Sequence, residues 1–144
     1  MRVDAILKSK PSSEVATIGP EATLAEAAAA LAEHRIGALV VSADGAGVLG
    51  MLSERDLVQE LAAHGGDCLS RTVSEVMTSE ITTAAPNDHA DEILNRMTQG
   101  RFRHMPVMAE GRMIGLVSIG DVVKARLDEL DFEKRSLEGM ITGH

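Results

Sequence analysis

The chain has 144 residues, of which 44% are hydrophobic and 25% charged, the balance of a globular protein made of one compact unit or of two small halves that share a core. Its 14 Lys and Arg residues against 22 Asp and Glu residues give a formal net charge of −8, which argues against a protein that binds nucleic acid through a basic face. No apolar run approaches the ~20 residues that span a bilayer, and the N-terminus opens no signal-peptide core, so we expect no membrane partner.

The scarcity of cysteine and aromatic residues narrows the chemistry further. The single cysteine, Cys68, excludes an internal disulfide and a multi-cysteine zinc site, so we expect a reducing, cytoplasmic compartment and no metal site. The sequence has two Phe and neither Trp nor Tyr, which excludes a sheet that recognises bases by aromatic stacking.

The first half of the chain reads as strand, helix, strand, strand and helix. Apolar residues recur at i, i+3, i+4 and i+7 from Leu24, which indicates an amphipathic helix. Thr23 with Glu26 predicts a capping box at its start, and Gly37 lies near its expected end, where a positive φ is often required. The elements expected are a strand at 15–18, a helix from 24, strands at 38–41 and 48–52 joined by an Asp-Gly turn, and a helix that starts at Ser53.

The second half repeats this order. Thr17 falls on Thr83 and Arg35 on Arg101 after a displacement of 66 positions (83 − 17), and residues 3–7 also resemble residues 73–77. The elements expected are a strand at 81–84, a helix from 90 capped by Asn87 or Asp88 and ending near Gly100, strands at 104–108 and 113–117, and a helix that starts at Ser118.

A half of roughly 60 residues buries too little apolar surface to be stable alone. We therefore expect two β-α-β-β-α repeats in an α/β (α+β) fold, packed sheet to sheet with pseudo-twofold symmetry and leaving clefts along their seam. The repeats are assigned to residues 1–66 and 67–130, and a helical tail to residues 131–144.

One polar motif occurs in both halves where the last strand meets the last helix. It is Gly-x-x-Ser-x-x-Asp, from Gly50 to Asp56 and from Gly115 to Asp121. The Ser and Asp are spaced as a capping box, which is a structural role. The same geometry suits a ligand, because a helix N-terminus attracts phosphate, a first-turn Asp accepts the hydroxyls of a ribose, and a strand glycine lets a ligand approach the backbone. The two roles are compatible.

The duplicated unit with this motif resembles a tandem pair of CBS domains, the Bateman module, over nearly the whole chain. The stretches 53–58, 103–107 and 115–121 are typical of small stand-alone bacterial members. The resemblance implies that an adenosine nucleotide (AMP, ADP, ATP or NAD) binds in the clefts between the repeats with no required cofactor. It also implies that the protein regulates a partner protein by a conformational change.

The resemblance also assigns candidate binding residues by position. They are Asp121 and Asp56 for the ribose, Ser118 and Ser53 for ribose or phosphate, Thr83, Ala85, Thr17 and Gly19 for backbone contacts to adenine, Met105 and Pro106 for an apolar wall, and Arg103 and His104 for the phosphates.

The two halves differ in charge at the phosphate end. Where the second half has Arg103 and His104, the first half has small uncharged residues. Arg55 would supply a guanidinium, and would lie near Arg103 if the clefts run head to tail; Lys8 and Lys10 would add charge. Solvated surface positions are the alternative interpretation for these Lys and Arg side chains.

The tail carries an apolar seam whose members alternate in spacing between four and three residues. This pattern fits either a long helix that packs back on its own half or a helix that reaches a second copy, and we expect a homodimer. The seam consists of Val123, Leu127, Leu130, Leu137 and Ile141, and Lys134 interrupts it at one position.

No motif for catalysis is present: there is no Gly-x-Ser-x-Gly elbow and no P-loop, so we expect no enzyme. The leading hypothesis is a regulatory module that senses adenosine nucleotides. The alternative is a ligand-independent dimeric adaptor, in which the Ser-x-x-Asp pairs only cap helices.

Overall fold

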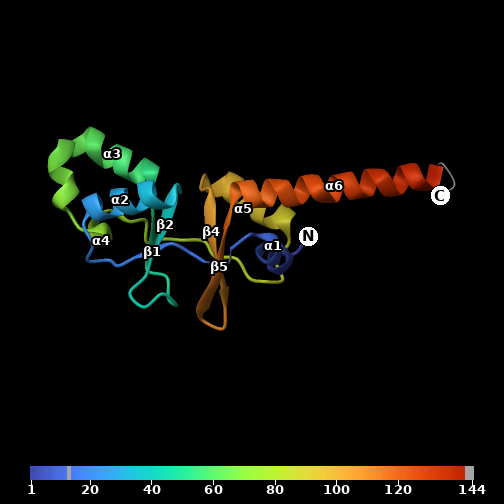
Figure 1. Ribbon diagram of the computed structural model, residues 1–144, viewed down its shortest axis with the longest axis horizontal. Helices are drawn as coiled ribbons and strands as arrows, with labels where there is room; N and C mark the ends of the chain where they lie inside the picture. The colour runs from blue at the N-terminus through green and yellow to red at the C-terminus, as the bar shows by residue number, and fades with distance from the viewer. Residues whose placement is uncertain (13, 142–144) are drawn as a thin grey trace.

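The computed structural model describes residues 1–12 and 14–141 and has the expected α+β architecture, with two small sheets flanked by helices (Figure 1). In chain order, the elements are α1 (Val3–Ser9), β1 (Thr17–Ile18), α2 (Leu24–His34), β2 (Ala38–Val41), β3 (Gly50–Ser53), α3 (Glu54–His64), the 3-10 helix η1 (Gly65–Ser70), α4 (Val73–Val76), α5 (Ala90–Gly100), β4 (His104–Ala109), β5 (Arg112–Ser118) and α6 (Ile119–Ile141).

The first sheet has the order β1-β2-β3, with β1 parallel and β3 antiparallel to β2. All four residues of β2 are buried, as expected for a central apolar strand. The free edge of β3 pairs with the linker between α4 and α5, because the Met51 and Thr78 backbones exchange N–H···O bonds of 2.9 Å in both directions.

The second sheet pairs β4 with β5 in antiparallel fashion, from His104 opposite Ser118 to a turn at Glu110 and Gly111. Both turn residues have positive φ, 52° and 77°, as a tight hairpin requires. The strand expected at 81–84 is wrong. Only Ala84 pairs with β4, through a single parallel bridge, because the residues before it leave the sheet.

The two repeats exchange their first helices. Val3 and Ile6 of α1 are buried in the core of the second repeat, with Ile93, Met105 and other residues of 84–125. Val73 of α4 is buried in the core of the first repeat. In Figure 1, α1 accordingly lies beside α5 and α6, and α4 lies beside α2 and α3. Each hydrophobic core is therefore completed by a segment that belongs to the other half of the sequence.

The strand glycines of the repeated motif make room for this exchange. A Cβ atom at Gly50 would lie 2.7 Å from the Thr78 carbonyl oxygen and 2.8 Å from the Met77 Sδ; one at Gly115 would lie 2.7 Å from the Leu7 Cδ2. The expectation that these glycines admit a ligand to the strand backbone is wrong, because the protein's own chain fills the space.

The helix ends agree in part with the sequence. The Thr23–Glu26 capping box is confirmed. The left-handed residues that end α2 and α5 are Arg35 and Arg101, with φ of 55° and 58°, and not the neighbouring glycines. Gly100 has a different role: the Phe102 ring occupies the space that a side chain at position 100 would need.

The start of α5 also differs from the expectation. The N-cap is His89, without a side-chain cap. Asp88 instead accepts the Ala85 N–H at 2.8 Å and a guanidinium N–H of Arg96 at 3.1 Å, so its carboxylate fixes the loop before the helix.

Helix α6 runs without a break from Ile119 to Ile141 and projects beyond the rest of the molecule (Figure 1). Val122 and Ala125 are buried at its start, whereas the seam residues Leu127, Leu130 and Leu137 are exposed. The tail thus does not pack back on its own half; residues 142–144 lie outside the described part. Cys68 is buried in the first core.

No helix in the described ranges combines the length and the apolar character needed to cross a membrane.

Candidate ligand clefts between the repeats

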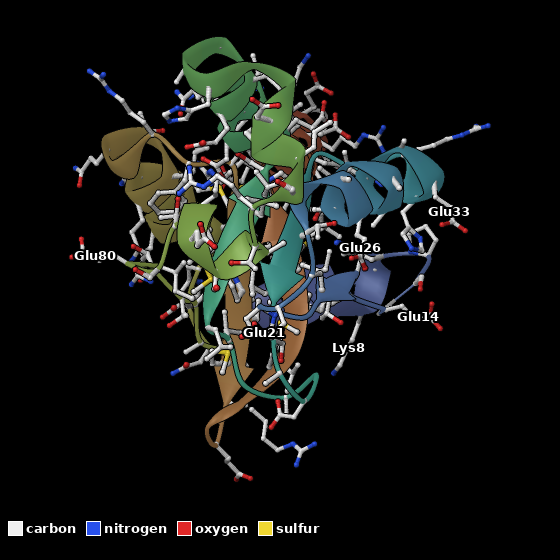
Figure 2. The ribbon with its side chains drawn as sticks, turned by 90° about the vertical axis from the view of Figure 1, so that its left-hand side faces the viewer. Lys8, Glu14, Glu21, Glu26, Glu33 and Glu80 are labelled. Atoms are coloured by element: carbon white, nitrogen blue, oxygen red, sulfur yellow. The ribbon has the colours of Figure 1, made fainter. Side chains whose placement is uncertain are left out.

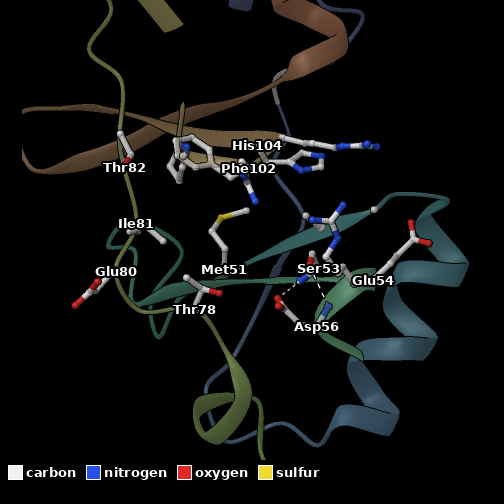
Figure 3. A pocket seen from close by; sticks show the side chains of 17 residues that line it. Met51, Ser53, Glu54, Asp56, Thr78, Glu80, Ile81, Thr82, Phe102 and His104 are labelled. Atoms are coloured by element: carbon white, nitrogen blue, oxygen red, sulfur yellow. Dashed lines mark hydrogen bonds between the residues drawn. The ribbon is translucent and has the colours of Figure 1, made fainter. Parts of the chain in front are cut away.

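One candidate site is a cleft of about 560 Å³ between the two repeats, which we call the first cleft. This volume is in the range of small-molecule sites. One side is formed by the end of β3 and the start of α3, the opposite side by the segment from Gly100 to β4, and a third by the linker at Thr78–Thr82 (Figure 3).

The polar end of the first cleft is the Ser-x-x-Asp motif of the first repeat. Asp56 Oδ2 accepts the Ser53 N–H at 2.8 Å, and Ser53 Oγ accepts the Asp56 N–H at 3.3 Å. This reciprocal capping box opens α3 (Figure 3). Because the backbone bond uses Oδ2, the second carboxylate oxygen is left to accept further hydrogen bonds, such as those of a ribose diol.

Basic side chains from both repeats line the same cleft. Arg55 comes from the first turn of α3, whereas Arg101 and Arg103 come from the segment between α5 and β4. All three are exposed. The nearby Glu80 side chain points away from the cleft in Figures 2 and 3. A cluster of guanidinium groups around an open cleft is suited to phosphate oxygens.

The rest of the lining of the first cleft is apolar. Met51 of β3, Ile81 of the linker, Phe102 and Pro106 line it. Figure 3 places Met51 and Phe102 on opposite sides of the cleft, with Ile81 on the linker beside them. A flat heterocycle fits such a slot, because burial of apolar surface and contact with a ring edge or face both favour it.

The second cleft, of about 600 Å³, lies at the corresponding motif of the second repeat and is lined by Thr17, Ala38 and His104 among others. Asp121 Oδ2 accepts the Ser118 N–H at 2.9 Å, and Ser118 Oγ accepts the Asp121 N–H at 3.1 Å. Unlike Asp56, Asp121 also holds a lysine: the Lys10 Nζ lies 3.0 Å from the same Oδ2.

Two titratable groups at this end have shifted pKa values. Burial raises the pKa of Asp121, but the Ser118 N–H and the Lys10 ammonium lower it, and the net pKa lies below the usual range. Burial lowers the pKa of His104; Lys10 and Arg103 lower it further, and this outweighs the opposite effect of Asp121 and Glu54. Because its pKa is lowered from the ordinary value of 6.5, His104 is mainly in the neutral form at pH 7. Its side chain lines both clefts.

The residues proposed from the sequence divide between these clefts. Around the first cleft the structure gathers Ser53, Arg55, Asp56, Arg103, His104 and Pro106; around the second it gathers Thr17, His104, Ser118 and Asp121. Arg103 and Pro106 thus belong with the Asp of the other repeat, as the head-to-tail arrangement expects.

Five proposed residues line neither cleft. Met105 is fully buried in the second core, and Thr83, Ala85 and Gly19 are not among the residues that line either cleft. The exposed Lys8 points out from α1 into solvent (Figure 2). The lysine that lines the second cleft is Lys10.

Sequence reasoning missed several lining residues, notably Arg101, Phe102 and the linker side chains Thr78 and Ile81. Arg101 had a signal, since it precedes Phe102 and Arg103 at the expected end of a helix. The linker had none, because nothing in its sequence places it between the sheets.

Within the described residues, no cluster of three or more His, Cys, Asp or Glu side chains is placed to hold a metal ion.

A family model described as the CBS domain matches residues 3–63 and 73–128. The chain therefore belongs to the CBS domain family and contains a tandem pair of these domains, which are regulatory rather than catalytic modules.

Relatives in sequence and structure agree with this assignment. CBS domain-containing protein YhcV of Bacillus subtilis is 33% identical over 116 residues, or 81% of each chain. The crystal structure of the CBS-domain containing protein ATU1752 from Agrobacterium tumefaciens is 44% identical, with a TM-score of 0.82, over 87% of this chain and 92% of that one.

A more distant likeness is the CBS domain pair of protein MJ0100, solved in complex with 5′-methylthioadenosine and S-adenosyl-L-methionine. It is 24% identical with a TM-score of 0.75, over 87% of this chain and 98% of that one. At this identity the likeness shows a shared fold alone.

Proposed function

We propose that this protein is a regulatory module that binds an adenosine nucleotide in the first cleft and transmits the resulting conformational change to a partner protein in the cytoplasm. The observation that carries the proposal is the convergence, in one open cleft, of a first-turn carboxylate, a cluster of guanidinium groups and an apolar slot. The two compounds bound by the CBS pair of MJ0100 each contain an adenosine, which supports the adenosine part of this ligand class.

Each part of a nucleotide has a counterpart in the cleft. The ribose hydroxyls would donate to the Asp56 carboxylate, which the Ser53 N–H already orients. The phosphates would accept from Arg55, Arg101 or Arg103. The adenine would lie between Met51 and Phe102. AMP, ADP, ATP and NAD share these parts, so the class is the adenosine nucleotides.

The signal would come from the position of the cleft. Asp56 and Arg103 belong to different repeats, so a ligand that contacts both binds best at one relative position of the repeats and shifts the population toward it. A regulated protein would read that change.

A second copy of the chain is the partner we propose for the exposed helix faces. Val58 and Leu61 on α3 and Leu127 and Leu130 on α6 are large apolar residues with exposed side chains, and two such surfaces on one molecule suit a homodimer.

Isothermal titration calorimetry with AMP, ADP, ATP and NAD tests the nucleotide proposal. We expect saturable binding of at least one, and a loss of about 5- to 150-fold in Asp56→Asn, the fold-change that corresponds to about 1–3 kcal/mol for an unpaired polar contact. Asn retains an oxygen for the Ser53 N–H, so the helix cap survives. Asp91→Asn, in the first turn of α5 and outside both clefts, is the matched control.

The adaptor remains the second candidate function, because both capping boxes are complete without any ligand. Thermal unfolding separates the two, followed by calorimetry or circular dichroism. A nucleotide at 100 times its dissociation constant adds about 2.7 kcal/mol of stability, whereas an adaptor shows no shift at any nucleotide concentration.

A further inference from the structure

The two clefts share the Ser-x-x-Asp motif but differ at the residue that faces it. In the first cleft, the Asp56 carboxylate has no cation within ion-pair distance among the described residues. In the second, Lys10 forms an ion pair with Asp121 at 3.0 Å, and the two side chains are only 28% and 23% exposed. The polar end of the second cleft is thus already filled by a positive group of the chain itself.

The position of Lys10 follows from a difference between the exchanged segments. After the short helix α4, the Thr78 backbone pairs with Met51 at the edge of the first sheet. Helix α1 continues to Ser9, so no backbone reaches the corresponding carbonyl, that of Leu116. The Lys10 Nζ donates to it instead, at 2.8 Å. Lys10 therefore completes a sheet edge and neutralises Asp121 at the same time, and its ammonium has two fixed acceptors.

Besides Lys10, the second cleft offers a phosphate the side chains of Ser12, Thr17 and His34. No arginine is among the described residues that line it, and Glu14 lines it together with Asp121. A nucleotide there would lack the guanidinium contacts of the first cleft but would keep the hydrogen bonds of the polar side chains if Lys10 were absent.

We propose that Lys10 closes the second cleft to nucleotides, so that the protein binds one adenosine nucleotide per chain, at Asp56. The inference rests on the proposed function and deepens it, since it assigns the occupancy of each cleft. A ribose at Asp121 would have to share the carboxylate with an ammonium that already neutralises it and that a second oxygen holds in place, whereas the Asp56 carboxylate has no such partner among the described residues.

The test is the stoichiometry of AMP binding, measured by titration calorimetry and by native mass spectrometry of the full chain. We expect one AMP per chain for the wild type and for Lys8→Met, the control on the exposed side of α1. Lys10→Met should bind two, and Lys10→Met combined with Asp121→Asn should return to one. Lys10→Arg retains the charge and should bind one. Lys10→Gln, which keeps a donor for Leu116, provides a second neutral variant whose fold is checked by circular dichroism.

The outcomes distinguish this inference from the proposed function. Two AMP per chain in the wild type, or one in both Lys10→Met and Lys10→Gln, would overturn the closure by Lys10 while nucleotide binding stands. Weaker binding by the single site in Lys10→Met would overturn it too, because Lys10 would then be a phosphate ligand. AMP binding by Lys10→Met but not by the wild type would overturn the proposed function at Asp56 and leave the closure by Lys10 intact.

Discussion

Leu7 packs directly against Gly115, so closely that a methyl group on the glycine would lie 2.7 Å from the Leu7 Cδ2. The same relationship joins Met77 to Gly50 in the first repeat, where the Thr78 carbonyl oxygen is also 2.7 Å from the position of the missing Cβ. Both contacts hold an exchanged segment against a strand of the other half of the sequence.

We expect Gly50→Ala to destabilise the protein more than Gly115→Ala. At Gly50 the added methyl meets a backbone oxygen, which cannot move without breaking the Met51–Thr78 pairing, whereas at Gly115 it meets the end of a leucine side chain. Overpacking of this kind costs about 1–3 kcal/mol. Urea unfolding followed by circular dichroism measures the difference. Gly66→Ala, where nothing lies within 4 Å, is the control, and equal stability of all three variants would contradict the contact.

The ion pair of Lys10 with Asp121 should make stability depend on pH at the acid end. The folded-state pKa of Asp121 is lowered, so its contribution is fully present above the ordinary value of 3.8 and is lost as the pH falls through the lower folded value. Lys10→Met should cost about 0.5–1 kcal/mol near pH 7, a difference that shrinks below about pH 4. Urea midpoints from pH 3 to 7, with Lys8→Met as the matched control, test this. If the stability difference between the wild type and Lys10→Met stayed constant down to pH 3, the contribution of Lys10 would not depend on the charge of Asp121.

Nucleotide binding should be coupled to protonation of His104. The pKa of His104 is lowered by burial and by the neighbouring Lys10 and Arg103, so the free protein holds it neutral at pH 7. A phosphate beside the ring would raise that pKa, and binding would take up a proton and tighten as the pH falls from 7 to 6. Calorimetry in buffers of different ionisation enthalpy measures the uptake. His104→Gln, which keeps a polar side chain, should bind without it; identical uptake in that variant would assign the proton to the ligand.

The proposed homodimer should depend on the apolar seam of α6. Leu127 and Leu130 are 61% and 49% exposed, and two glutamates in their place would put like charges into the interface. We expect Leu127→Glu with Leu130→Glu to sediment as a monomer at concentrations where the wild type is a dimer. Phe132→Glu changes an exposed residue on the opposite side of the helix and should leave the dimer intact. A monomeric wild type would refute the dimer directly.

Local features could be predicted from the sequence because their causes are local. The capping box at Thr23 and the Ser-x-x-Asp boxes at Ser53 and Ser118 depend on residues three apart, and the spacing from Leu24 marks the buried face of α2. The family resemblance and the fold class are confirmed.

The sequence patterns could not predict which residues that are distant in the chain come into contact. Lys10 contacts Leu116 from 106 residues away, and no periodicity encodes such a pair. The roles of Gly50 and Gly115 were misassigned for the same reason, since a strand glycine looks alike whether a ligand or a helix covers it. Ile81 also has the β-branched character of a strand residue, but the linker carries it into the first cleft.

The crossed arrangement of α1 and α4 determines when the protein can reach its native state during synthesis. Among the described elements, α1 leaves the ribosome before the others, yet Val3 and Ile6 are buried among residues from Ala84 to as late as Ala125. The α1 segment must therefore wait, without these neighbours, until the residues up to Ala125 have been synthesised. Because domains otherwise tend to fold from the N-terminus as they emerge, here the beginning of the chain is among the last parts to settle.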